Sequence, residues 1–139
     1  MRSSGLVVAD TSVWIPFFNR PESDEKRALD DLIDERQLAL VGVVLAELLQ
    51  GCRTTKETDT ILSKLTGLRF LETSLSTWRR TGELSASLRR KGLTIPLTDL
   101  IIAALALEHG CQVYAVDPHF TQVPGLSHYR PRRRPARRG

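Results

Sequence analysis

The sequence feature that most constrains the fold is a set of short apolar runs that stop at a carboxylate. Asp10 follows the run 6–9, and Asp117 follows the run 113–116. These runs are apolar throughout rather than at every second residue, which is typical of strands buried on both faces of a parallel sheet. Helical patterns alternate with the runs, so we predict an α/β domain with a parallel central sheet and helices on both faces.

The remaining elements follow from apolar periodicity and from cap and stop residues. Glycines at 51, 92 and 110 end three of the helices, and Pro96 forces a break before another. The pattern predicts strands at 6–9, 38–41, 68–71 and 113–116, and helices at 13–18, 22–36, 43–50, 56–65, from a cap at Ser74 or Ser76 to Arg90, and 98–109.

Four carboxylates stand inside apolar stretches: Asp10, Glu47, Asp99 and Asp117. No Lys or Arg lies within three residues of any of them, so a local ion pair does not explain them. A buried carboxylate must be paired, protonated or bound to a metal, because desolvating it alone costs several kcal/mol. Strand ends and helix starts place all four toward one edge of the predicted sheet, where ligand sites of open α/β sheets lie.

Carboxylates gathered in this way repel one another, and a divalent cation is the usual remedy. Hard oxygen ligands without His or Cys favour Mg²⁺ or Mn²⁺, which suits hydrolysis of phosphodiester bonds. Simpler explanations exist for single residues. Asp10 and Asp99 fit as helix N-caps, and Glu47 fits as a residue on a helix face.

Length and charge indicate one domain with a basic end. The chain has 139 residues and a formal net charge of +4. Six of its 20 basic residues lie between Arg130 and Arg138, where there is no acid, so residues 1–129 carry 14 basic and 16 acidic groups. We therefore expect a single domain at 1–129 and an Arg-rich, disordered tail at 130–139.

The sequence predicts a cytoplasmic protein that does not enter a membrane. No apolar run approaches the roughly 20 residues of a membrane span, and the start of the chain has no signal-peptide pattern. Cys52 and Cys111 lack the spacing of metal ligands and fit two reduced thiols.

Four segments together resemble the PIN-domain ribonucleases, in particular the VapC-type toxins of toxin–antitoxin pairs. They are residues 8–15, 46–51, 98–104 and 116–120, and the resemblance spans residues 6–129. It implies a parallel α/β sheet, a requirement for Mg²⁺ or Mn²⁺, and endonucleolytic cleavage of RNA. Asp10, Glu47, Asp99 and Asp117 become the catalytic acids, with Asp10, Asp99 and Asp117 as direct metal ligands. Glu47 would act through a coordinated water or a second ion.

The resemblance also assigns substrate contacts, and here the chain departs from the family pattern. The hydroxyl of Thr11 or Ser12 would orient Asp10 or contact a phosphate, and His119 would contact RNA. Ala115 stands where Thr or Ser is frequent, and His119 stands where many members carry a further Asp. Whether a second metal has its own ligand there is left open by these residues.

The expected partners are RNA, a cognate antitoxin and a second copy of the chain. Residues 13–18 are strongly apolar, and we expect about three of the five apolar residues to be core. The rest, with Leu48 and Leu49, fit a groove for a partner helix, which the resemblance would fill with the antitoxin. Trp78 and Leu84 are candidates for a homodimer surface.

Three other functions compete with a toxin nuclease. A catalytically degenerate PIN-like binding module is disfavoured by the presence of all four acids. A housekeeping RNA-processing PIN nuclease has the same site residues. A phosphoacceptor or phosphatase-type domain would need a second Asp within two residues of Asp10 and a Lys after a late strand, and neither occurs.

Overall fold

The computed structural model of the protein describes residues 3–132. Its strands are short and lie in one sheet: β1 (Val7–Ala9), β2 (Leu38–Val41), β3 (Arg69–Leu71), β4 (Gln112–Tyr114) and β5 (Ser127–His128). The order across the sheet is β3-β2-β1-β4-β5, and every neighbouring pair is parallel. Val8 in the central strand pairs with Ala39 on one side and with Val113 on the other. The predicted parallel sheet is therefore confirmed.

The helices begin and end where cap residues allow. They are α1 (Thr11–Asn19), α2 (Asp24–Asp34), α3 (Gly42–Gln50), α4 (Thr55–Leu65), α5 (Leu75–Arg90) and α6 (Leu97–His109), followed by the 3₁₀ helix η1 (Pro118–Gln122). Ser74 caps α5 through a reciprocal pair of hydrogen bonds with Thr77, a capping box. Gly110 ends α6 in the left-handed conformation, with φ of 63°.

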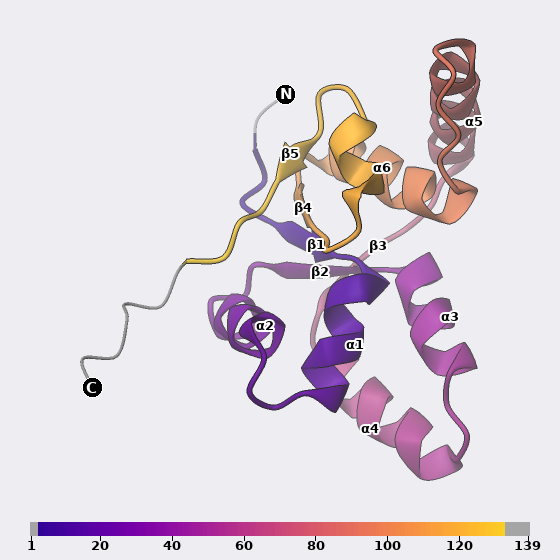
Figure 1. Cartoon of the computed structure of the whole chain (residues 1–139). Coiled ribbons are helices and arrows are strands. Elements are labelled where there is room, and N and C mark those ends of the chain that lie inside the picture. The colour runs from indigo at the N-terminus through magenta and orange to yellow at the C-terminus, as the bar shows by residue number, and fades with distance from the viewer. Residues whose placement is uncertain (1–2, 133–139) are drawn as a thin grey trace.

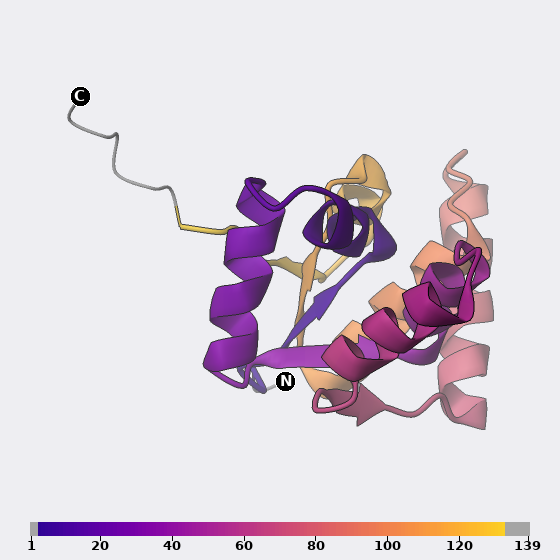
Figure 2. The same ribbon diagram turned by 90° about the horizontal axis from the view of Figure 1, so that it is seen from below.

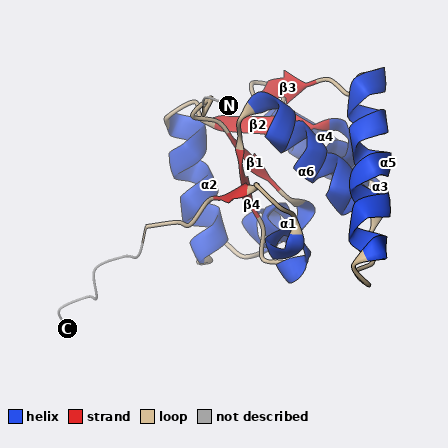
Figure 3. Ribbon diagram, turned by 90° about the horizontal axis from the view of Figure 1, so that it is seen from above, coloured by secondary structure: helices blue, strands red, loops and turns tan. Residues whose placement is uncertain are grey.

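The helices cover both faces of the sheet, as predicted. In Figure 1, α1 and α2 lie on one side of the sheet, while α6 lies on the other side with α5 packed outside it. Figure 2, seen from below, shows the same order of layers with α4 nearest the viewer. The β1-to-α1 and β2-to-α3 turns both leave the sheet at its carboxyl edge (Figure 3).

Helix α6 is buried on nearly all sides, which explains why its sequence is apolar rather than amphipathic. Its seven residues from Leu100 to Ala106 are all buried. Full burial of a side chain such as Ile102 or Leu105 contributes roughly 1.5–3 kcal/mol. The first turn of this helix carries Asp99, so the packing of α6 fixes the position of that carboxylate.

The structure differs from prediction after β4. The strand was expected over 113–116, but it ends at Tyr114, and Val116 is 60% exposed. The backbone N–H of Val116 donates to the Ser12 hydroxyl at 3.1 Å instead of continuing the sheet. The chain then forms η1 and the two-residue edge strand β5, neither of which its polar sequence predicted.

Two expectations concern the chain as a whole. Within residues 3–132, no helix is both long and apolar enough to cross a membrane. Arg130 and Arg132 are exposed at the end of the described chain. The predicted disorder of the Arg-rich tail falls mainly on residues 133–139, which lie outside the described residues.

Candidate active site

The four predicted acids come from four separate elements at one end of the sheet. Asp10 follows β1 directly and is the N-cap of α1, whereas Asp117 lies three residues beyond β4 and is the N-cap of η1. Glu47 lies in α3, and Asp99 lies in the first turn of α6. Because β1 and β4 are adjacent and parallel, their carboxyl ends deliver Asp10 and Asp117 to the same edge.

One half of the site, which we call the hydroxyl side, consists of Asp10, Thr11, Ser12 and Glu47. The Thr11 hydroxyl donates to Glu47 Oε1 at 2.9 Å. The buried Asp10 carboxylate accepts from the backbone N–H of Ser12 at 3.2 Å. The resemblance implied that the hydroxyl of Thr11 or Ser12 would orient Asp10 or contact a phosphate. In the structure, a backbone amide holds Asp10, and the Thr11 hydroxyl instead orients Glu47.

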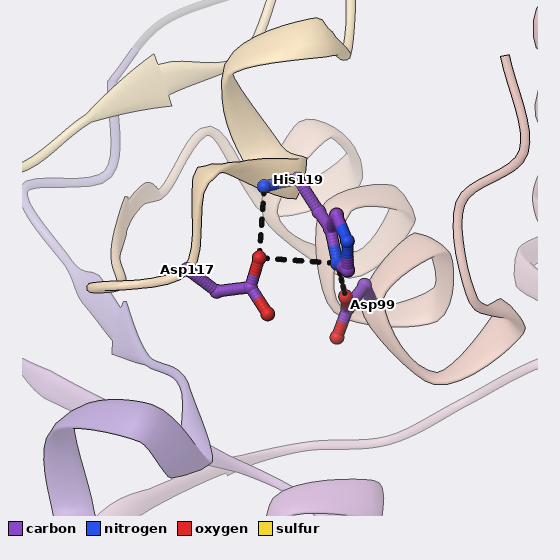
Figure 4. A group of neighbouring side chains, drawn as sticks. All are labelled: Asp99, Asp117 and His119. Carbon is purple, nitrogen blue, oxygen red and sulfur yellow. Dashed lines mark hydrogen bonds and ion pairs between the residues drawn. The ribbon is translucent and has the colours of Figure 1, made fainter.

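The other half, which we call the imidazole side, consists of Asp99, Asp117 and His119 (Figure 4). The Nδ1 atom of His119 lies 2.8 Å from Asp99 Oδ2 and 3.1 Å from Asp117 Oδ1. The backbone N–H of His119 also donates to Asp117 Oδ1, at 2.9 Å. The sequence predicted His119 as a substrate contact, but it gave no sign that the ring lies between two of the acids.

The carboxylates of the two sides are close enough for the charge on one side to raise pKa values on the other. Burial raises the pKa of Asp99, and the charges of Asp10 and Asp117 raise it further, against a hydrogen bond from the neighbouring imidazole that lowers it. Burial likewise raises the pKa of Glu47, opposed by the Thr11 hydrogen bond and reinforced by the charges of Asp10 and Asp99. The four acids therefore form one region of negative charge.

The negative charge of these acids also stabilises the protonated, positively charged form of His119. Its hydrogen bond with Asp99 raises the pKa of the imidazole, and the charges of Asp117, Asp99 and Asp10 act in the same direction. A positive charge is thus favoured between Asp99 and Asp117. A cation of any kind at this position would relieve the repulsion among the carboxylates.

The imidazole side fits a divalent metal ion. Asp99, Asp117 and His119 each offer one ligand atom, and these atoms lie within 4.8 Å of one another. Within residues 3–132 this is the one group of metal-ligating side chains that comes together so closely, and neither Asp10 nor Glu47 belongs to it. Two carboxylates and an imidazole suit Mg²⁺, Mn²⁺ and other first-row divalent ions.

An apolar groove lies beside the acids and shares Glu47 with them. Its volume is about 510 Å³, and its apolar lining comes from α1, α3 and α4 and includes Ile15, Phe18, Leu48 and Ile61. Three of the five apolar residues at 13–18 are core, namely Val13, Trp14 and Phe17, as predicted. Leu48 lines the groove as expected, whereas Leu49 is not among its lining residues.

The fold and the site together define a class of protein. The chain belongs to the PIN-domain family, whose sequence model matches residues 7–126. That match covers every strand up to β4 and all four acids.

Individual relatives agree with this assignment. The chain is 29% identical to Ribonuclease VapC2 of Rickettsia felis over 126 residues, which cover 87% of this chain and 94% of the relative. It is 25% identical to Ribonuclease VapC11 of Mycobacterium tuberculosis over 126 residues, covering 88% and 94%. Among solved structures, the crystal structure of VapBC2 from Rickettsia felis bound to a promoter DNA fragment matches with a TM-score of 0.77 at 22% identity, covering 89% and 97%. DNA-bound VapBC from Salmonella typhimurium matches with a TM-score of 0.75 at 22% identity, covering 89% and 96%. At these identities the solved structures establish a shared fold.

Proposed function

We propose that the chain is a VapC-type endoribonuclease that hydrolyses RNA phosphodiester bonds with the help of a divalent metal ion. The observation that carries the proposal is the gathering of four carboxylates from four elements in a PIN domain. Relatives named as VapC ribonucleases align over nearly the whole chain. We expect the protein to act in the cytoplasm, where its substrate is found.

The residues divide the chemistry between them. Asp99 and Asp117 are the proposed direct ligands of Mg²⁺ or Mn²⁺, whereas Asp10, the third ligand expected from the sequence, lies outside their close group of ligand atoms. The cation, when bound, would lower the pKa of the attacking water and neutralise charge on the phosphate. Asp10 lies near enough for its charge to raise the pKa of Asp99, so the two carboxylates belong to one region of negative charge.

The hydroxyl side supplies orientation and a base. Thr11 holds Glu47 Oε1, which leaves Oε2 free to accept a hydrogen bond from the attacking water. Glu47 has a raised pKa, which suits a carboxylate that takes up a proton during the reaction. The Ser12 hydroxyl accepts from Val116, and through its own proton it can donate to a phosphate oxygen. As the resemblance to PIN-domain ribonucleases implies, we expect hydrolysis to leave a 5′-phosphate and a 3′-hydroxyl.

Cleavage of RNA by the purified chain tests the proposal directly. We expect cleavage of a mixed RNA pool with Mn²⁺ or Mg²⁺, none with a chelator, and none by Asp10→Asn or Asp99→Asn with either metal. Asp34→Asn is the matched control, because Asp34 is exposed on α2 and outside the site. A wild-type chain that cleaves no RNA in the pool and binds neither metal would contradict the proposal.

We further propose that the apolar groove receives a helix of an antitoxin. The solved relatives include VapBC complexes from Rickettsia felis and Salmonella typhimurium. Support comes from Ile15, which is 49% exposed although it is flanked by core residues, and from Glu47, which places the groove next to the acids. A helix with an apolar face and a basic residue would match both features.

A single substitution in the groove tests this partner. Ile15→Glu is expected to abolish co-purification with the cognate antitoxin, while RNA cleavage persists. Leu62→Glu is the matched control, since Leu62 is exposed on α4 but does not line the groove. Equal co-purification by both variants would place the antitoxin elsewhere.

A homodimer surface is proposed on α5. Leu75 and Trp78 are 86% and 58% exposed, and their spacing of three residues puts them on one face of the helix. Leu84, the other predicted contact, packs partly against the core instead. We expect Trp78→Glu to halve the mass measured by light scattering and Leu62→Glu to leave it unchanged. A monomeric wild-type chain would contradict this surface.

A further inference from the structure

The position of His119 gives the metal site a property that its carboxylates alone do not have. An imidazole nitrogen, rather than a third carboxylate oxygen, completes the group of ligand atoms that lie within 4.8 Å of one another. The same nitrogen, Nδ1, is the atom nearest to both Asp99 and Asp117 (Figure 4). The ring therefore presents one defined donor to the position that a shared cation would take.

The two separations measured from His119 Nδ1 match those between neighbouring ligands of one coordination sphere. An octahedral ion with bonds of about 2.0–2.1 Å places neighbouring ligand atoms about 3 Å apart. Nδ1 of His119 lies 2.8 Å from Asp99 Oδ2 and 3.1 Å from Asp117 Oδ1. Nδ1 thus stands at the separation of an adjacent ligand from each carboxylate, and it would bind the ion after losing the proton that it shares with Asp99.

The backbone around His119 is fixed by independent contacts. Asp117 caps η1 and accepts the N–H of His119 at 2.9 Å, and Pro118 at the first position restrains the entry to the helix. Phe120, the next residue, is fully buried in the core. These contacts fix the backbone of His119, and the two carboxylates hold the ring, whose side chain is 40% exposed.

We propose that His119 Nδ1 is a metal ligand and that it makes this site prefer Mn²⁺ over Mg²⁺. This inference rests on the proposed metal-dependent function and names the ion. Mg²⁺ favours an all-oxygen sphere, whereas imidazole suits first-row transition ions, and Mn²⁺ gains more from a nitrogen donor than Mg²⁺ does. Asp99 and Asp117 supply the charge that either ion needs, and His119 supplies the discrimination.

Metal binding by the full chain tests the proposal without reference to RNA cleavage. At a pH where the imidazole is neutral, Mn²⁺ binding is measured by electron paramagnetic resonance and then competed with Mg²⁺. The wild-type chain is expected to favour Mn²⁺, and His119→Asp is expected to reduce the ratio of the two affinities roughly tenfold by restoring an oxygen ligand. His109→Asp, at the exposed far end of α6, is the matched control and keeps the wild-type ratio.

A spectroscopic signature separates ligation from a merely structural role. Pulsed resonance of bound Mn²⁺ is expected to show nitrogen hyperfine coupling in the wild-type chain and in His109→Asp, but none in His119→Asp. Circular dichroism of each variant establishes that it is folded. An absent nitrogen coupling in the wild-type chain, or an unchanged affinity ratio in His119→Asp, overturns this inference.

The same metal-binding measurements distinguish an error about the role of His119 from an error about the metal-dependent function. Asp99→Asn is measured beside the other variants, and it is expected to lose both ions. If Asp99→Asn loses Mn²⁺ while His119→Asp keeps the wild-type ratio, the metal-dependent function stands and the role of His119 falls. If the wild-type chain binds neither ion, both proposals fall together.

Discussion

The two sides of the candidate active site hold their carboxylates by different means. On the hydroxyl side, neutral groups donate hydrogen bonds to the carboxylates: a backbone amide donates to Asp10, and the Thr11 hydroxyl donates to Glu47. On the imidazole side, a titratable ring lies between Asp99 and Asp117. Neutral donors orient an anion without changing the net charge of the site, whereas an imidazole can be neutral, positively charged or bound to a metal.

The fold sets the geometry of both sides, whereas the pH and the metal ions in solution set the charge of the imidazole side. The hydroxyl side joins the start of α1 to Glu47 of α3 and is set once the chain folds. The imidazole side is also placed by the fold, but its charge depends on protons and metal ions. We therefore expect changes on the hydroxyl side to act through geometry, and changes on the imidazole side to act through charge.

The largest expected effect comes from removing one acid from each side. Asp10→Ala and Asp99→Ala should each reduce RNA cleavage by about three orders of magnitude, because each loses several kcal/mol of transition-state stabilisation. Their effects on stability should differ. Asp10→Ala loses a helix cap and about 1 kcal/mol, whereas Asp99→Ala removes a carboxylate whose pKa burial and repulsion raise.

Thermal denaturation in a chelator, beside cleavage assays, measures both quantities. We expect a lower melting temperature for Asp10→Ala and an unchanged or higher one for Asp99→Ala. Asp34→Ala provides the baseline for an exposed acid. Equal destabilisation by the two site variants would show that the sides do not differ in the way described.

Metal-induced stabilisation should belong to the imidazole side. At a Mn²⁺ concentration one hundred times the dissociation constant, binding to the folded chain adds about 2.7 kcal/mol to its stability. Asp117→Asn should lose this gain, while Thr11→Val should keep it, since Thr11 contacts Glu47 and none of the three grouped ligands. Melting curves with and without Mn²⁺ measure this gain in stability for each variant. Loss of the gain in Thr11→Val would mean that both sides hold the ion.

The sequence could predict where Asp10 lies on the hydroxyl side, but not the hydrogen bond between Thr11 and Glu47. An apolar run that ends at Asp10 and continues into Thr11 and Ser12 carries both the strand and the helix cap in adjacent residues. Asp99 was predictable for the same reason, because Pro96 marks the start of its helix. Local sequence determines local structure at these points, and the predicted sheet and helices followed.

The imidazole side was not predictable in the same detail. β4 ends two residues early because Val116 donates to Ser12, more than a hundred residues away in the sequence. η1 depends on the Asp117 cap, and β5 depends on pairing with β4, so neither has a periodic apolar pattern of its own. The contact of His119 with Asp99 crosses 20 residues and requires the folded sheet. The metal ligands assigned from sequence remain predictions until an ion is bound.

A smaller effect is expected from Thr11→Val, which keeps the shape of the side chain and removes one hydrogen bond. Cleavage should fall by roughly tenfold and stability by about 1 kcal/mol. Because the Thr11 hydrogen bond lowers the pKa of Glu47, its loss should raise that pKa and move the acidic limb of the pH–rate profile to higher pH. Thr66→Val, which removes an exposed hydroxyl at the end of α4, is the control. An unchanged acidic limb would remove Glu47 from the proton transfer.

The smallest expected effect is the pH dependence of stability without metal. The pKa values of Glu47, Asp99 and His119 are all raised from their ordinary values of 4.5, 3.8 and 6.5. A group whose pKa is higher in the folded chain binds its proton more tightly there. Its contribution to the free energy of unfolding is at its full value below the ordinary pKa. This contribution is lost as the pH rises through the raised pKa. For the two carboxylates this loss begins in the acidic range, and for His119 it begins near neutrality.

From about pH 6 to about pH 8, the decline in stability should therefore come from the imidazole side. In a chelator, the melting temperature of the wild-type chain is expected to fall across this interval, and His119→Gln should fall less. His109→Gln, which changes an exposed histidine outside the site, should decline like the wild type. Saturating Mn²⁺ should reverse the trend, because the ion replaces the proton between Asp99 and Asp117 and binds more tightly as the proton leaves. Parallel declines for His119→Gln and the wild type would instead place the titrating group outside the imidazole side, and the contrast between the two halves of the site would then rest on geometry alone.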